Sequence, residues 1–114
     1  MEESRLNYEK WEMKRVFPNA MLWRDKDGHG TLYWELIYRV YTINVFYTSG
    51  YPFVPARIFI SPALRTHHHQ EDLSVCWQRG GEWNPSWTAT TVMGKAIQFI
   101  SEFKSRRTRD DVLF

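Results

Sequence analysis

The spacing of apolar residues predicts a helix near each end of the chain. Between residues 4 and 17, Leu6, Met13, Val16 and Phe17 fall on one face at helical spacing, and Pro18 marks the end of that helix. Between residues 88 and 105, apolar side chains again recur every three or four positions, and Thr88 is a suitable N-cap. The apolar stripe of this second helix consists of Val92, Ala96, Phe99, Ile100 and Phe103.

Four short segments between these helices predict β-strands. They cover residues 20–24, 31–38, 41–47 and 57–60, and they are rich in β-branched and aromatic side chains. In the third segment, Tyr41, Ile43, Val45 and Tyr47 alternate with their neighbours, as in a half-buried antiparallel strand. The connections are short, and the first is a turn by composition over residues 25–30. The predicted fold class is α+β, with a four-stranded antiparallel meander, an N-terminal helix and a C-terminal helix in a single domain spanning 1–114.

Composition limits the cellular compartment and the classes of partner that we expect for this domain. The chain has one cysteine, so an internal disulfide cannot form and the fold must do without one. The first residues lack the apolar segment of a signal peptide, and no run approaches the roughly 18 apolar residues of a membrane helix. The net charge of +2 is too small to indicate nucleic-acid binding. We therefore expect a cytoplasmic protein with no membrane or nucleic-acid partner.

Residues 62–87 show no long regular element, although they lie inside a compact domain. Loops of this length are usually functional or disordered, and the aromatic content here argues against disorder. The segment contains Cys76, the only cysteine. By itself, a lone cysteine is often a small buried apolar residue, whereas an exposed thiolate would be a nucleophile.

The histidines at positions 67, 68 and 69 have several interpretations. His67 and His69 share one side if the segment is extended, and Cys76 with Glu71 or Asp72 could complete a metal site. However, no Cys/His pair has a recognised metal-binding spacing, so no metal is predicted. A second interpretation is that the histidines form hydrogen bonds within the loop. A third is a cysteine-protease dyad of Cys76 with a nearby histidine, but so small a domain offers little room for a substrate cleft.

Three motifs in order resemble those of ubiquitin-conjugating enzymes. Tyr51-Pro52-Phe53-Val54-Pro55 resembles the family's Tyr-Pro-Phe-x-Pro-Pro turn, and Leu73-Ser74-Val75-Cys76 resembles the strand that delivers the active-site cysteine. Trp83-Asn84-Pro85-Ser86-Trp87-Thr88 resembles the loop that opens the following helix. The spacing from Tyr51 to Cys76 matches common members without a gap. The resemblance covers roughly residues 4 to 103 and implies a minimal ubiquitin-conjugating (UBC-like) fold.

Two departures distinguish this chain from typical members. The family usually carries His-Pro-Asn shortly before the cysteine, and the ungapped alignment places Thr66-His67-His68 there. Typical members also continue for two more helices beyond the position of Ile100. In both respects the chain looks more like the compact prokaryotic relatives of these enzymes, which suggests a bacterial ubiquitin-like system.

The resemblance implies a transferase that carries a ubiquitin-like protein as a thioester on Cys76 and passes it to an amine or thiol. The implied partners are the ubiquitin-like protein, an activating enzyme, and a ligase or protein substrate. No cofactor is implied, because the activating enzyme consumes the ATP. The alternative is a non-catalytic variant of the same fold that acts as a protein-binding module.

The resemblance also implies roles for other residues. His68 takes the position of the asparagine that, in the family, is assigned to donate a hydrogen bond to the oxyanion of the reaction. His67 and His69 are alternates for this role. Lys10, Lys14 and Arg15 are expected to contact the activating enzyme through the first helix. Tyr8 and Trp11 lie on the outer side of that helix, where they either form a docking surface or pack against a loop. Phe53, Pro85 and Trp87 are expected to form an exposed patch for a ligase or acceptor, unless Trp87 simply caps the core.

Overall fold

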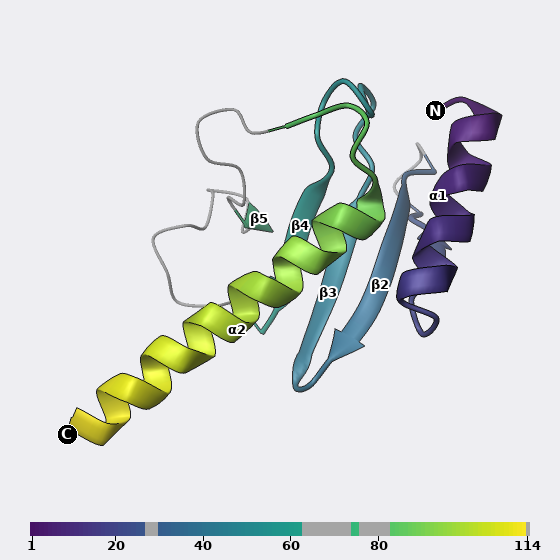
Figure 1. Ribbon diagram of the computed structural model, residues 1–114. Helices are drawn as coiled ribbons and strands as arrows, with labels where there is room; N and C mark the ends of the chain where they lie inside the picture. Colours follow the sequence, from purple (N-terminus) through teal and green to yellow (C-terminus); the bar gives the residue numbers. More distant parts are fainter. Residues whose placement is uncertain (27–29, 63–73, 76–82, 114) are drawn as a thin grey trace.

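The computed structural model describes residues 1–26, 30–62, 74–75 and 83–113; for residues 74–75 and 103–113 only the backbone is described. The chain begins with helix α1 (Glu3–Val16), which ends at Phe17, where the backbone leaves helical geometry before Pro18. Strands β1 (Met21–Arg24), β2 (Leu32–Tyr38), β3 (Tyr41–Phe46), β4 (Arg57–Ser61) and the short β5 (Ser74–Val75) follow. The last element is helix α2 (Ala89–Leu113), whose C-terminal part extends beyond the sheet in Figure 1.

The described strands form one antiparallel sheet in the order β1-β2-β3-β4-β5. The β2–β3 hairpin is tight, since Tyr38 pairs with Tyr41 and only two residues join the strands. Arg39 occupies the first of these positions with φ of 57°, in the left-handed region that a tight hairpin requires. The predicted α+β meander with its two flanking helices is thus confirmed.

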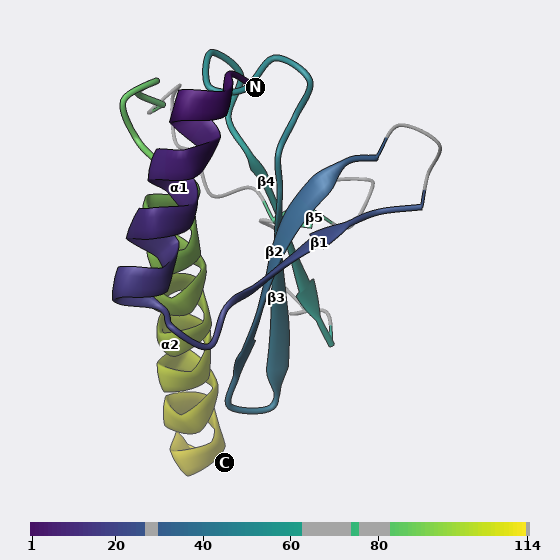
Figure 2. The same cartoon turned by 90° about the vertical axis from the view of Figure 1, so that its right-hand side faces the viewer.

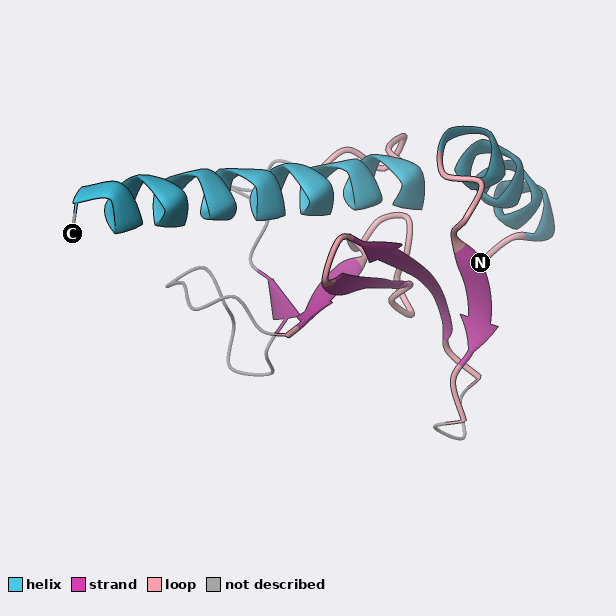
Figure 3. Cartoon of the chain, turned by 90° about the horizontal axis from the view of Figure 1, so that it is seen from below, coloured by secondary structure: helices cyan, strands magenta, loops and turns pink. Residues whose placement is uncertain are grey.

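Both helices lie on the same face of the sheet, as Figure 2 shows, and the opposite face carries no helix in Figure 3. The alternation predicted for β3 holds, because Tyr41, Ile43, Val45 and Tyr47 are all buried. The core between sheet and helices also contains, with at most 1% exposure, Met13, Trp34, Ile58, Val92, Met93, Ala96 and Ile100. The sheet's inner face and the apolar stripe of α2 therefore bury each other.

Several sequence-based details need correction. Val16 is 44% exposed, because the last turn of α1 meets the core through Met13 and Phe17 instead. Residue 9 occupies the buried face of α1 instead, and it is a glutamate. Helix α2 runs to Leu113 rather than to residue 105, since the charged residues that follow the apolar stripe are also good helix formers. Residues 74–75 form a short fifth strand. The four-stranded meander did not include it, although the resemblance implied a strand before Cys76.

Candidate functional site

The strand that leads to Cys76 joins the free edge of β4. Val75 pairs with Ile58, and Ser74 pairs with Phe59. Ile58 is completely buried between the sheet and α2, so this pairing ties the segment before Cys76 to the core. Cys76 itself lies outside the described residues, as do His67, His68, His69, Glu71 and Asp72. Within the described residues, no three His, Cys, Asp or Glu side chains gather to hold a metal ion.

The two loops that resemble family motifs contact each other. The indole Nε1 of Trp83 donates a 2.7 Å hydrogen bond to the main-chain oxygen of Pro52. The Trp83 ring also packs against Tyr51, with ring centroids 5.9 Å apart, and edge-on against Trp87 at 5.8 Å. Gly50 permits the first turn, because a Cβ there would lie 2.5 Å from the Val54 side chain. The structure therefore brings together two segments that are more than thirty residues apart.

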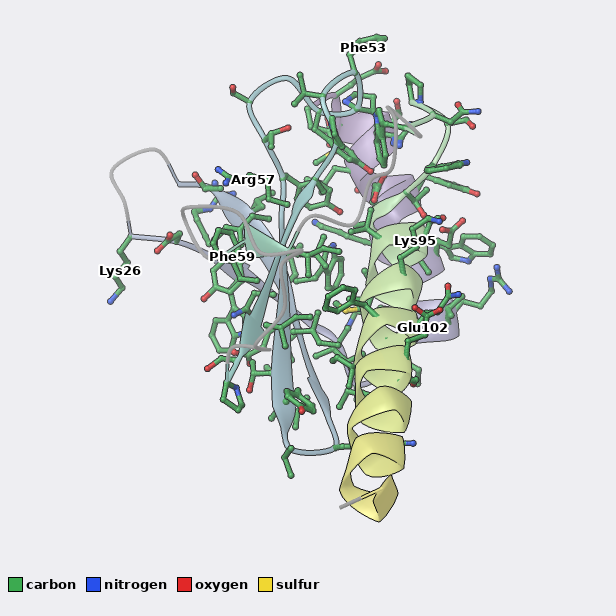
Figure 4. The ribbon with its side chains drawn as sticks, turned by 90° about the vertical axis from the view of Figure 1, so that its left-hand side faces the viewer. Lys26, Phe53, Arg57, Phe59, Lys95 and Glu102 are labelled. Carbon is green, nitrogen blue, oxygen red and sulfur yellow. The ribbon has the colours of Figure 1, made fainter. Side chains whose placement is uncertain are left out.

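The residues of the expected docking patch differ in exposure. Phe53 is 80% exposed at the tip of its turn and projects from the end of the molecule in Figure 4. Pro85 is exposed, whereas Trp87 is only half-buried. The Lys95 ammonium of α2 lies 5.1 Å from the centre of the Trp87 ring, a cation–π contact. Phe53 and Pro85 are thus open to solvent, whereas Trp87 joins its loop to α2.

The outer side of α1 is basic and aromatic. Lys10, Lys14 and Arg15 are exposed there. The Arg15 guanidinium lies 5.2 Å from the centre of the Trp11 ring, and Trp11 lies 5.9 Å from Tyr8. Tyr8 and Trp11 are half or more exposed, so within the described residues they form an open surface rather than packing under a loop.

Glu9 is a fully buried carboxylate on the opposite side of α1. Its Oε1 accepts hydrogen bonds from the Tyr47 hydroxyl at 3.0 Å and from the main-chain N–H of Ala89 at 2.8 Å. Its Oε2 accepts hydrogen bonds from the Tyr51 hydroxyl at 2.6 Å and from Arg5 Nε at 2.9 Å. Four donors from four parts of the chain therefore satisfy a charge that would otherwise be very costly to bury.

The two tyrosines of this network act as neutral hydrogen-bond donors. Burial, followed by the negative charge of Glu9, raises the pKa of Tyr47 far above its ordinary value. Burial and the hydrogen bond to Glu9 likewise raise the pKa of Tyr51 well above its ordinary value. The Tyr47 oxygen also accepts a 2.8 Å hydrogen bond from Trp34 Nε1, which extends the network into the core. Both phenols therefore keep their protons throughout the physiological pH range.

Arg5 connects α1 to the loop that precedes α2. One guanidinium nitrogen, Nη1, donates to the main-chain oxygen of Pro85 at 3.0 Å, and the other, Nη2, donates to that of Trp87. The same side chain forms the ion pair with Glu9 and lies 5.3 Å from the centre of the Tyr51 ring. Helix α1 is thereby fastened to both loops that flank the strand leading to Cys76.

The start of α2 is held from two sides. Thr88 serves as its N-cap, as predicted, because its hydroxyl oxygen accepts a hydrogen bond from the N–H of Thr91 at 3.4 Å. The same hydroxyl donates to the Glu12 carboxylate. Glu9 accepts from the N–H of Ala89, the first residue of the helix, where a negative charge is favourable to the helix dipole.

The network around Glu9 was missed by sequence reasoning. A signal was present: Glu9 lies between Leu6 and Met13 at spacings of three and four on the apolar face, and Arg5 precedes it by four. Its other partners, however, lie 38 to 80 positions away, so only the folded chain brings them together. Without knowledge of those partners, a glutamate at that position would be assigned to the solvent-exposed border of the helix.

Comparisons with protein-family models, with curated proteins and with solved structures find no match to this chain. Among the described residues, neither helix combines the length and the apolar composition that are needed to cross a membrane.

Proposed function

We propose that the protein accepts an activated ubiquitin-like protein as a thioester on Cys76 and transfers it to an amine or thiol acceptor. The observation that supports this proposal is that all three segments that resemble family motifs are tied into one fold. The strand before Cys76 pairs with β4, and the two loops that resemble family motifs are joined to each other by the Trp83–Pro52 hydrogen bond.

The proposed reaction has two exchange steps. The Cys76 thiolate attacks the thioester carbonyl of the loaded activating enzyme, a new carbon–sulfur bond forms, and the activating enzyme's thiolate leaves. The acceptor amine then attacks the new thioester, loses a proton to solvent or a nearby base, and Cys76 leaves as the thiolate. An ordinary cysteine has a pKa of about 8.5, so only a few per cent is ionised at neutral pH, which suffices when the partner thioester is held in place.

Each attack places negative charge on the carbonyl oxygen, which needs a hydrogen-bond donor. We propose His68 for this role, with His67 and His69 as alternates, because each ring can donate from a nitrogen. This role rests on the resemblance; the hydrogen bonds of Glu9 and Arg5 hold α1, the 51–54 turn and the 83–88 loop together. We further propose a reducing cytoplasm as the setting, where Cys76 stays a thiol.

The proposal is tested by incubating the protein with its activating enzyme, ATP and the ubiquitin-like protein. A thiol-sensitive adduct should form, Cys76→Ala should abolish it, and Cys76→Ser should give a thiol-resistant ester. An adduct that survives in Cys76→Ala contradicts the proposal. A folded protein that binds the ubiquitin-like protein without forming an adduct would instead support the non-catalytic binding module.

A further inference from the structure

The face of the sheet that the helices leave uncovered, here called the outer face, is rich in aromatic side chains. The register sets Trp23, Tyr33 and Phe46 side by side in one row across β1, β2 and β3. Tyr33 and Phe46 stack with ring centroids 4.5 Å apart, and Phe59 of β4 meets Phe46 edge-to-face at 5.3 Å. Figure 4 shows Phe59 on the side of the sheet away from α2. An aromatic face of this kind is suited to cover by a further layer of protein.

The outer face has a projecting ring at one side and a hollow at the other. Trp23, on the edge strand β1, is 43% exposed, and Met21 beside it is 53% exposed. A pocket of about 710 Å³ opens near the end of β3 and the start of β4, with Phe46 and Phe59 among the residues that line it. This volume lies in the usual range of small-ligand sites, about 300 to 1,000 Å³, and is ample for one indole ring. Trp23 is not among the lining residues, so the ring and the pocket are separate features of one face.

A two-fold axis relates these two features. An axis parallel to the strands, between β2 and β3, lays two copies face to face and exchanges β1 with β4 without changing the position along the strands. The row of Trp23, Tyr33 and Phe46 continues to the first residue of β4. Trp23 of one copy therefore comes to the start of the partner's β4, where the pocket opens, and Tyr33 comes to the partner's Phe46. Each copy supplies one ring and receives one.

The charges of the outer face suit a second copy of the chain. Over β1 to β4 this face carries one acidic and one basic side chain, Glu35 and Arg57. A face without net charge neither repels its own copy nor selects a strongly charged partner. The axis brings Glu35, which is half-buried, to the partner's Asn44 near the centre of the interface. Taking this carboxylate out of water opposes association.

The size of the outer face also points to weak association. Strands β1 to β4 each present two or three outward residues. With strands about 4.8 Å apart and outward residues about 6.8 Å apart along each strand, the face covers roughly 400 Å². Two copies then bury about 800 Å² together, which is less than the usual 1,200 to 2,000 Å² of a stable interface. We therefore expect association to be reversible.

We propose that the protein forms a weak symmetric dimer through the outer face, with the Trp23 ring of each copy inserted into the pocket of its partner. Met21 of each copy then covers the partner's Phe59, because these two residues share the next row of the register. The dimer is a four-layer sandwich of helices, sheet, sheet and helices, so both faces of each sheet are covered. This inference does not depend on the proposed transfer reaction.

Sedimentation equilibrium of the full chain tests the dimer, with a reductant present so that Cys76 cannot link two chains. Between about 10 µM and 1 mM, the wild type should shift from monomer towards dimer, with a dissociation constant of about 100 µM. Trp23→Ala should weaken association about a hundredfold, roughly tenfold for each of the two inserted rings. Trp11→Ala removes an even more exposed tryptophan from α1 and should leave association unchanged. A wild type that stays monomeric at about 1 mM, or an equal loss in the two variants, overturns the proposal.

Mixing two variants tests the reciprocal insertion. Phe59→Ala removes one wall of the pocket, so it should associate poorly by itself, as should Trp23→Ala. An equimolar mixture should associate more strongly than either variant alone, because a mixed dimer keeps one intact ring and one intact pocket. Thermal melts check that both variants fold. If Phe59→Ala melts early, Ser49→Trp, which fills the pocket from an exposed position, takes its place. A mixture that associates no better than its components overturns the reciprocal arrangement.

Glu35→Gln tests the position of the axis. Removing this carboxylate from the centre of the interface should strengthen association, because its desolvation no longer opposes the dimer. Glu3→Gln removes an equal charge from the exposed start of α1 and should leave the dissociation constant unchanged. An unchanged or higher dissociation constant for Glu35→Gln overturns the proposed axis.

Discussion

The main-chain N–H of Ala89, where α2 begins, donates a hydrogen bond to the side chain of Glu9, eighty positions earlier on α1. This contact makes the carboxylate of one helix the partner of the other helix's first turn. It also places α1 in direct contact with the loop that leads into α2, where Arg5 binds two further main-chain oxygens.

Glu9→Gln should destabilise the fold severely. The amide nitrogen of glutamine cannot accept a hydrogen bond, so at least one of the four donors around it loses its partner and the Arg5 ion pair is lost. We expect a loss of about 3 kcal/mol in the free energy of unfolding. Denaturant titration measures it, with the exposed Glu3→Gln as the matched control, for which the change should stay below about 1 kcal/mol. Equal effects of the two substitutions would contradict the role of Glu9.

Tyr47 should make stability fall at alkaline pH. Its pKa is raised in the folded protein, so above pH of about 10 the unfolded chain loses the phenol proton while the folded chain keeps it. Stability is then lost as pH rises, by about 1.4 kcal/mol per pH unit for this one group. Unfolding titrations between about pH 9 and 11 should show a shallower decline in Tyr47→Phe. Ile37→Ala, which removes an exposed side chain without a titratable group, should keep the wild-type slope.

Charge reversal on α1 should slow loading without unfolding the protein. Lys10 and Lys14 are exposed, so Lys10→Glu with Lys14→Glu should leave the melting temperature nearly unchanged. If the activating enzyme docks there, the loading rate of Cys76 should fall and lose part of its salt dependence, because steering by opposite charges is screened by salt. Lys26→Glu on the distant β1–β2 hairpin is the control. Equal loading rates for all three proteins at low salt would place the docking surface elsewhere.

Phe53→Ala should affect transfer rather than folding. The side chain is 80% exposed, so its removal costs the fold little. An aromatic anchor at a protein interface typically contributes more than about 1 kcal/mol, so discharge of Cys76 to a ligase or acceptor should slow by at least fivefold while loading stays normal. Ile37→Ala removes a similarly exposed apolar side chain from the far end of β2 and should slow neither step. Unchanged discharge in Phe53→Ala excludes this turn as the docking point.

His68→Ala should slow discharge of the preloaded thioester by roughly 100- to 1000-fold, the usual effect of losing one oxyanion donor. The melting temperature should hardly change, and His68→Asn should recover part of the rate. Single-turnover discharge is measured beside thermal melts for alanine at positions 67, 68 and 69 in turn. If none of the three slows discharge by about threefold, far below the range for a lost donor, the oxyanion is held by other groups.

Local patterns predicted most of the fold. The alternation along residues 41–47 gave the buried face of β3 correctly, because the period of a strand is set by the backbone alone. The end of α1 near Pro18 and the Thr88 cap were also predictable, since both depend on a few neighbouring residues.

The remaining features depend on contacts between distant parts of the chain. Val16 has a spacing that suits the core, but Met13 and Phe17 fill that part of it. Glu9 has the wrong chemistry for the core but meets its partners there. In the candidate site, the exposure of Phe53 agrees with expectation, whereas the link from Arg5 to the Pro85 and Trp87 oxygens involves main-chain acceptors that a sequence cannot display.

The Glu9 network also constrains how the sequence can drift over evolutionary time. Each of positions 5, 9, 47 and 51 supplies a group that at least one of the others needs, so a single replacement leaves a buried charge or polar atom unmatched. A lineage could abandon the network only by changing the charged pair together, for instance to two apolar side chains of similar volume. These four positions should therefore covary among descendants of a common ancestor, and intermediates with only one change should be rare.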